Sequence, residues 1–173
     1  MMKALILLVF SLCLAVLAGC QTASPGSSSP PAKASSVPPA KTKAQIEAEK
    51  KAFTETKAKA EQGDAAAQSD LSVMLSKGYG APRNYKLAFS WCKLSAVQGN
   101  ARAQCNLGVK YYEGKGVEKD YIRAHMWLNI SARNGVEGAL RLQQVVAKMM
   151  SHTQIEKAQD WAGECIKKNY KGF

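Results

Sequence analysis

Few side chains in this sequence have the type and spacing that catalysis or metal binding requires. The chain of 173 residues has two histidines, His125 and His152, and 13 acidic residues. It contains no His-x-x-x-His or Cys-x-x-Cys pair, no glycine-rich phosphate loop and no Gly-x-Ser-x-Gly nucleophile elbow. We expect His125 on a semi-exposed helix surface and His152 at the start of a helix. We therefore predict no enzyme activity, no cofactor and no metal site.

One cysteine stands at the end of an apolar N-terminal segment. Lys3 precedes an apolar run over residues 4–17, which is too short for a comfortable membrane span and is typical of an export signal. The ending Leu17-Ala18-Gly19-Cys20 resembles the bacterial lipobox. This resemblance implies that residues 1–19 are removed as a lipoprotein signal peptide and that the Cys20 thiol is acylated. An ordinary signal peptide with a chance cysteine is the alternative.

The segment that follows has the composition of a disordered tether. After Cys20, residues 21–43 are almost only Ser, Pro, Ala, Gly, Thr and Lys, which bury too little apolar surface to offset chain entropy. Attached acyl chains would hold residues 20–43 at a bilayer as a lipidated tether. We thus expect a lipid anchor in the bacterial cell envelope. Gln21, where an aspartate would act as a retention signal, favours the periplasmic face of the outer membrane.

The charge of the chain restricts the classes of partner. There are 24 Lys and Arg against 13 Asp and Glu, for a net charge of +11. This excess suggests anionic neighbours, such as a phospholipid surface, an acidic cell-wall polymer or an acidic protein. No basic run with interleaved aromatic residues occurs, and we do not expect nucleic-acid binding.

A repeat of 36 residues organises the rest of the chain. Residues 67–102 align with residues 103–138 without a gap, and twelve positions are identical. These pairs are Ala67/Ala103, Gln68/Gln104, Leu71/Leu107, Val73/Val109, Gly78/Gly114, Gly80/Gly116, Tyr85/Tyr121, Ala88/Ala124, Trp91/Trp127, Ser95/Ser131, Ala96/Ala132 and Gly99/Gly135. Apolar residues at helical spacing in each half of the unit predict two antiparallel helices, with Gly78 and Gly114 as C-caps and Asn84 and Asp120 as N-caps. A fixed period of this length is typical of a solenoid.

The repeated residues resemble a known family. Residues 103–135 follow the pattern A-x-x-x-L-G-x-x-Y-x-x-G-x-G-V-x-x-D-x-x-x-A-x-x-W-x-x-x-A-A-x-x-G, with Ser131 for the first alanine of the pair. This pattern resembles the Sel1-like repeat, a relative of the tetratricopeptide repeat. The resemblance implies an all-α fold, an α/α solenoid of helix-turn-helix repeats with about seven helices in a right-handed superhelix. The repeat domain is predicted over residues 44–169.

The expected layout begins with a helix over residues 44–62. Full repeats then cover residues 64–99 and 100–135, and residues 136–169 form a partial third repeat with a closing helix. Trp127 is predicted in the core. Glu55 occupies the position of Trp91 and Trp127 in the leading helix, as the polar outer face of an end helix requires.

The resemblance implies that the protein is a protein-binding adaptor. Its partner would be an unknown protein or peptide of the envelope. The first helices of the repeats would line its curved inner face. Their solvent-facing positions are the candidate contacts: Asp70, Met74, Lys77, Asn106, Lys110 and Glu113. A plain solvated face is the alternative for each of them. A binder of an anionic envelope polymer, or a modulator of a cell-wall enzyme, is the alternative function.

The remaining cysteines allow one disulfide. Cys92 and Cys105 lie at similar distances from the turn at Gly99, and an exported domain would tolerate a bridge between them. Free thiols are the alternative, with Cys105 the more exposed of the two, and Cys165 is left over. A cysteine-rich branch of the family includes proteins described as binding or slowly hydrolysing β-lactams. Its two cysteines would stand at Ala96 and Gln104 here, which gives little support to that third function.

Overall fold

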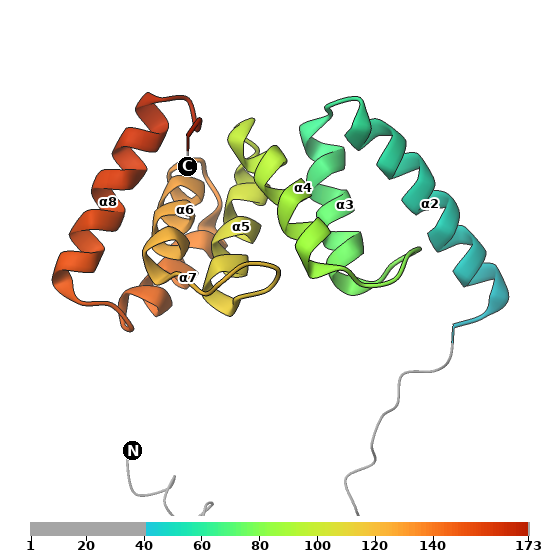
Figure 1. The fold of residues 1–173 in the computed structure, drawn as a ribbon, viewed down its shortest axis with the longest axis horizontal. Coiled ribbons are helices and arrows are strands. Elements are labelled where there is room, and N and C mark those ends of the chain that lie inside the picture. The colour runs from blue at the N-terminus through green and yellow to red at the C-terminus, as the bar shows by residue number, and fades with distance from the viewer. Residues whose placement is uncertain (1–40, 173) are drawn as a thin grey trace, which may run out of the picture. The chain divides into compact units, whose positions relative to one another are not determined.

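Residues 41–172, described here in a computed structural model, form a succession of α-helices joined by short turns (Figure 1). Their bounds are α2 (Lys43–Glu61), α3 (Ala65–Lys77), α4 (Tyr85–Val97), α5 (Ala101–Glu113), α6 (Tyr121–Arg133), α7 (Glu137–Ala147) and α8 (His152–Lys167). The predicted signal segment and Cys20 lie outside the described residues. None of the helices in the described range is long and apolar enough to cross a membrane. The predicted all-α repeat fold with about seven helices is confirmed.

Each hairpin begins and ends at residues that satisfy free backbone groups. The Asn84 side chain accepts a hydrogen bond from the Leu87 backbone N–H at 3.0 Å, and Asp120 accepts one from the Arg123 N–H at 2.9 Å. Such N-caps supply acceptors for amides that have no partner within the helix. Gly78 ends α3 and Gly114 ends α5 in the left-handed conformation. The predicted caps are therefore confirmed.

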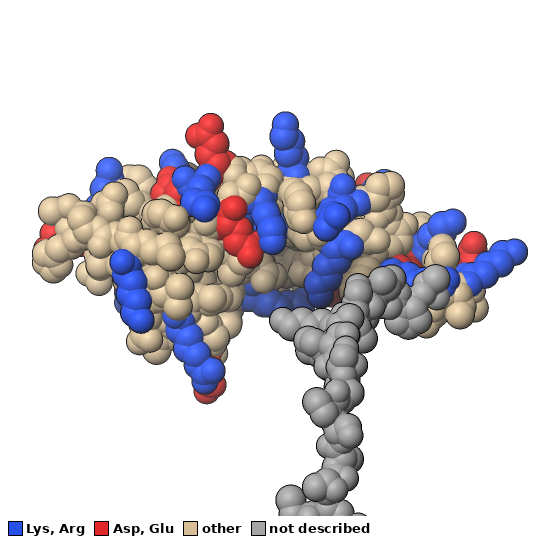
Figure 2. Space-filling view, turned by 90° about the horizontal axis from the view of Figure 1, so that it is seen from below, with Lys and Arg blue, Asp and Glu red and all other residues tan. Residues whose placement is uncertain are grey.

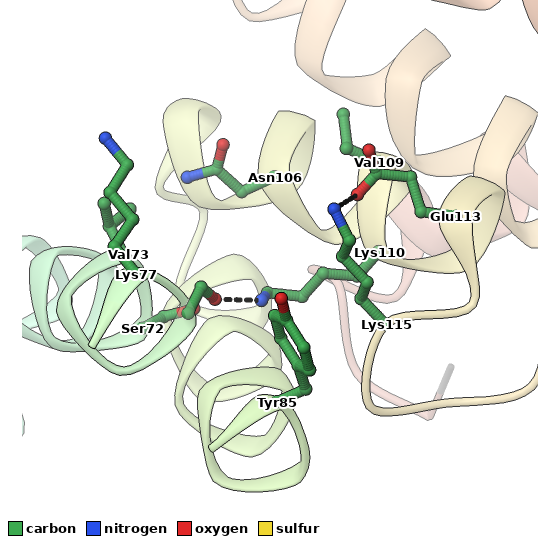
Figure 3. A pocket seen from close by; sticks show the side chains of 10 residues that line it. Ser72, Val73, Lys77, Tyr85, Asn106, Val109, Lys110, Glu113 and Lys115 are labelled. Atoms are coloured by element: carbon green, nitrogen blue, oxygen red, sulfur yellow. Dashed lines mark hydrogen bonds and ion pairs between the residues drawn. The ribbon is translucent and has the colours of Figure 1, made fainter. Parts of the chain in front are cut away.

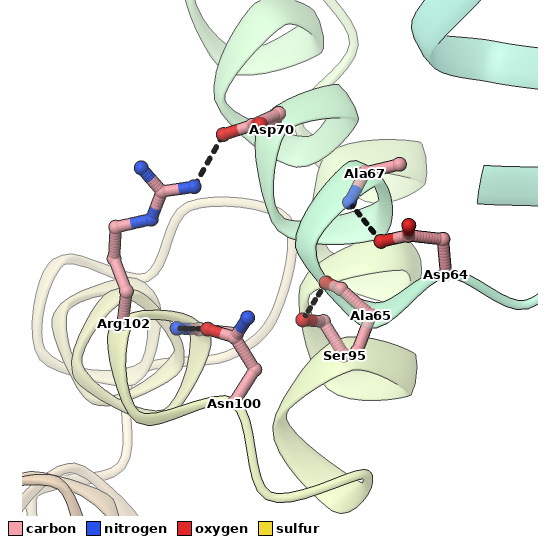
Figure 4. A network of polar contacts seen from close by, with 8 residues as sticks. Asp64, Ala65, Ala67, Asp70, Ser95, Asn100 and Arg102 are labelled. Carbon is pink, nitrogen blue, oxygen red and sulfur yellow. Dashed lines mark hydrogen bonds and ion pairs between the residues drawn. The ribbon is translucent and has the colours of Figure 1, made fainter. Parts of the chain in front are cut away.

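Polar side chains join neighbouring helices at the same 36-residue period. The Ser95 hydroxyl donates to the Ala65 carbonyl at 2.5 Å (Figure 4), and Ser131 donates to the carbonyl of Ala101 at 2.7 Å. The buried amides repeat in the same way, as the Gln68 side chain bonds to the Ala60 carbonyl and Gln104 to that of Ala96, each at 3.2 Å. Because buried polar groups are costly without partners, the serine bonds hold the two helices of one hairpin together, and the glutamine bonds hold each hairpin in register with the helix before it.

The interior has two clusters of buried residues. Trp127 is 1% exposed and lies in the larger one, as predicted, whereas Trp91 is partly buried beside the smaller cluster. Gly108 packs against Leu128, and a Cβ atom at Gly108 would lie 2.7 Å from the Leu128 Cγ. The preceding repeat has Ser72 and Cys92 at these two positions. The smaller partner leaves room for the serine, whose hydroxyl donates to the Ala88 carbonyl at 2.7 Å.

The C-terminal end closes differently from the interior of the stack. Helices α7 and α8 both pack against α6. Ala158, Ala162 and Cys165 of α8 are fully buried. Helix α7 buries only Ala139 and Val146. Leu140, Leu142 and Val145 of α7, and Met149 just after its end, are exposed apolar side chains.

Candidate functional site

Four of the six predicted contact residues line one cavity of about 250 Å³ between α3 and α5 (Figure 3). They are Lys77, Asn106, Lys110 and Glu113. The other lining residues are Ser72, Val73, Ser76, Tyr85, Val109 and Lys115. Of the two remaining predicted residues, Met74 is half-buried outside this lining, and Asp70 forms an exposed ion pair with Arg102 (Figure 4). The structure thus brings most of the predicted set together.

Lys110 differs most from its prediction. It was expected to face solvent, but only 7% of it is exposed. Its side chain crosses from α5 toward α3, and its ammonium donates to the Ser76 hydroxyl at 2.8 Å. It forms no ion pair with any carboxylate among residues 41–172. Burial lowers the pKa of the Lys110 ammonium, while the nearby Glu113 charge acts in the opposite direction.

The charges around the cavity are mostly positive. Glu113, the lining carboxylate, is engaged by Lys115 at 3.0 Å, which leaves the positive charges of Lys77 and Lys110 in excess. Figure 2 shows more Lys and Arg side chains than Asp and Glu side chains on the face that it displays. The pKa of Lys115 is raised, first by its hydrogen bond to Glu113 and then by the charge of that residue. The arrangement favours an anionic group.

Six lining residues were missed by sequence reasoning, and for three of them the reason is local. Ser76 precedes Lys77 and was not assigned to the solvent-facing set. Lys115 lies in the turn after α5, and Tyr85 is the first residue of α4. Neither therefore belongs to the solvent-facing positions of α3 and α5 that helical spacing predicts. The Tyr85 ring lies near two cations, with the Arg83 guanidinium 5.6 Å and the Lys115 ammonium 6.0 Å from its centroid. The same basic–aromatic pairing recurs one repeat later, where the Lys119 ammonium lies 5.9 Å from the Tyr121 ring centroid.

The proposed bridge between Cys92 and Cys105 is not formed in the structure. Both thiols are free, as is that of Cys165. The Cys92 thiol donates to the Ala103 carbonyl at 3.3 Å, and burial raises its pKa to about 11. Cys105 is the more exposed of the two, as predicted. Similar height of two cysteines in a hairpin is therefore not enough for a disulfide to form. The Cys92 side chain is directed at the backbone of α5 instead.

His125 is buried, contrary to the prediction of a semi-exposed surface. It is 2% exposed, and its Nε2 atom lies 3.2 Å from the Nε2 atom of Gln143 on α7. Burial lowers the pKa of His125. The equivalent Phe89 is only partly buried, since α4 is not covered in the way that α7 and α8 cover α6. Among the described residues, no group of three or more His, Cys, Asp and Glu could hold a metal ion.

The comparisons with known proteins agree with this architecture. The family model for the Sel1 repeat matches residues 65–100 and 101–136. The crystal structure of c5321, "a protective antigen present in uropathogenic Escherichia coli strains displaying an SLR fold", is 28% identical, with a TM-score of 0.67, over 70% of this chain and 27% of that one. A Sel1 repeat protein from Oxalobacter formigenes is 26% identical, with a TM-score of 0.52, over 66% of this chain and 49% of that one.

The chain therefore spans about half or less of the length of these two structures. No curated protein matches its sequence. Both matched repeats coincide with the observed hairpins α3–α4 and α5–α6. Residues 65–136 therefore match two Sel1 repeats, and the fold of the described chain is similar to those of Sel1-repeat proteins.

Proposed function

We propose that this protein is a lipid-anchored scaffold of the bacterial cell envelope, which binds a protein partner on the face formed by α3 and α5. Sel1-repeat proteins generally are protein-interaction scaffolds, and their fold is typically non-catalytic. The observation that carries the proposal is the cavity between α3 and α5, where Lys77, Asn106, Lys110 and Glu113 come together from two repeats.

The partner is best sought by crosslinking in living cells. A photo-crosslinking residue at Asn106 lies in the cavity lining, whereas the same residue at Lys86, exposed on α4, is a matched control outside it. We expect a discrete crosslinked protein from Asn106 and not from Lys86. Identical products from both positions, or none from Asn106, would count against the α3–α5 face.

The proposed anchor rests on the sequence of residues 1–20. An apolar run followed by Leu17-Ala18-Gly19-Cys20 supports acylation at Cys20, and Gln21 supports the periplasmic face of the outer membrane. Cys20→Ser removes the thiol that would carry the lipid. We expect the variant to lose acyl labelling and to leave the membrane fraction in its processed form or to accumulate uncleaved. Unchanged membrane association of a processed form that carries no lipid label would contradict the anchor.

A second candidate, binding of an anionic envelope polymer, is favoured by the basic surface. All of the 24 basic residues except Lys3 and Lys33 lie in the described range, together with all 13 acidic ones. A polymer held by many charges would dissociate steeply as ionic strength rises, because salt screens exposed charges. Binding of a protein in a cavity with one buried ammonium would depend on salt only weakly. Pull-down at low and moderate salt separates the two candidates.

A further inference from the structure

The Lys110 ammonium has hydrogen-bonding capacity that the protein does not use. An ammonium carries three N–H donors, and the Ser76 hydroxyl accepts one of them. Lys110 is more than nine-tenths buried and lines the cavity, and no second protein acceptor for its ammonium is found among residues 41–172. Burying a charge without an opposite charge is unfavourable. The cavity therefore contains a cation that an anion would stabilise.

The repeats show that the fold does not need a lysine at this position. The residue 36 positions earlier is Met74, and the residue 36 positions later is Val146, which is 1% exposed. An apolar side chain fills the same slot in both neighbouring helices. Replacing Lys110 by an apolar residue of similar length should thus be tolerated by the packing. The lysine is explained by binding rather than by stability.

The surroundings suit a carboxylate. The Asn106 side chain lines the same cavity and can donate from its amide, and Lys77 adds a second positive charge at the rim. Glu113 does not compete for Lys110, because it is paired with Lys115 at 3.0 Å. A planar group with two acceptor oxygens could therefore bond to the Lys110 ammonium while lying beside Asn106. Charge-assisted bonds of this kind are stronger than neutral ones.

Exposed apolar side chains lie beyond the cavity, on α7. Helices α5 and α7 are in contact, and Leu142 and Val145 of α7 occupy the positions of Asn106 and Val109 one repeat earlier. Leu142 is 37% exposed and Val145 is 42% exposed. The Asp70–Arg102 ion pair also joins α3 to α5. A bound segment that continues past the cavity would therefore find exposed apolar side chains on α7.

We propose that the cavity between α3 and α5 binds the side-chain carboxylate of a glutamate or aspartate in a segment of a partner protein, with Lys110 as its anchor and apolar residues of that segment on α7. This inference rests on the proposed scaffold function and names the chemistry of the partner. It does not depend on the lipid anchor or on the cellular location.

The test uses the purified full-length chain with labelled valine methyl groups, because Val73 and Val109 line the cavity. Three small probes differ in whether they carry a carboxylate and where it stands: N-acetylglutamate α-amide has a side-chain carboxylate, N-acetylglutamine has an α-carboxylate, and N-acetylglutamine amide has neither. We expect the first probe to shift both methyl signals saturably and to bind more tightly than the second. Equal shifts from the neutral probe, or tighter binding of the second probe or of inorganic phosphate, would overturn the proposal.

Lys110→Met, which reproduces the residue of the preceding repeat, should weaken binding of the first probe about tenfold or more, as expected for a lost hydrogen bond to a charged group. Its unfolding midpoint in urea should equal or exceed that of the original protein. The matched control Lys86→Met, outside the cavity, should bind the probe normally. Equal weakening in both variants, or a lowered midpoint in Lys110→Met, would refute the assignment. Failure of the crosslinking experiment with normal probe binding would instead remove the scaffold function and keep the site.

Discussion

Substitution of Gly116 by alanine tests how closely successive repeats approach. Gly116 lies in the turn between α5 and α6 and has φ +84°. A Cβ atom there would lie 2.0 Å from the Tyr85 carbonyl oxygen, at the start of α4. Gly80 repeats this arrangement, since its Cβ would lie 2.4 Å from the Glu49 carbonyl oxygen of α2. Each such turn therefore packs against the backbone of a helix one repeat earlier.

The same substitution at Gly135 separates the steric cost of the added Cβ atom from the cost of the left-handed backbone conformation. Gly135 has φ +90°, and nothing lies within 4 Å of the position of its Cβ atom. An alanine in the left-handed region costs about 1–2 kcal/mol at either position. Overpacking adds about 1–3 kcal/mol at Gly116 alone. We thus expect Gly116→Ala to lower the free energy of unfolding by about 2–5 kcal/mol and Gly135→Ala by about 1–2 kcal/mol.

The assay is urea unfolding followed by helical circular dichroism and by tryptophan fluorescence, with the free energy of unfolding extrapolated to water. The difference between the two variants, about 1–3 kcal/mol, measures the approach of the turn to α4. Equal destabilisation by both substitutions would refute the packing of the turn on Tyr85. It would also argue against close packing as the reason that a glycine is needed at position 80.

Three further results are expected from unfolding experiments. Trp127→Ala should destabilise the protein by about 3–5 kcal/mol, because the ring is 1% exposed, and a near-neutral result would contradict the repeat register. Gly108→Ser should be destabilising alone and should recover in combination with Leu128→Cys, which recreates the serine–cysteine pair of the preceding repeat; additive effects in the double-mutant cycle would argue against their contact. His125 has a lowered pKa in the folded protein, so the unfolded chain binds a proton at this residue more readily. The contribution of His125 to stability should therefore be complete above about pH 6.5 and fall as the pH decreases below it. Urea unfolding at several pH values measures this, and an equally steep loss in a His125→Gln variant would contradict it.

The candidate site was predictable to the extent that it follows from the repeat. A period of 36 residues places Lys77 and Glu113 at equivalent points, and likewise Asp70 and Asn106, so that a shared face could be read from the sequence. The turn residue Lys115 and the helix start at Tyr85 could not be read in this way. Their contribution depends on how the turn and α4 lie beside the cavity, which helical spacing does not describe.

Burial of individual polar groups was not predictable from one sequence. His125 appears semi-exposed when compared with Phe89, but α7 and α8 cover α6 more completely than the interior neighbours cover α4. Cys92 and Cys105 have the height that a disulfide requires, yet the Cys92 thiol bonds to the Ala103 carbonyl. Both outcomes depend on side-chain direction and on the end of the array.

The sequence by itself determined the helical hairpins, their period and the residues that begin and end them, because caps, turn glycines and small residues at helical spacing are local features. The tertiary structure decided that Lys110 is buried and that α3 and α5 enclose a cavity around it. That decision depends on the distance between two helices that are not adjacent in the chain. Local periodicity fixes which face a residue occupies, but only packing sets how far that face lies from its neighbour.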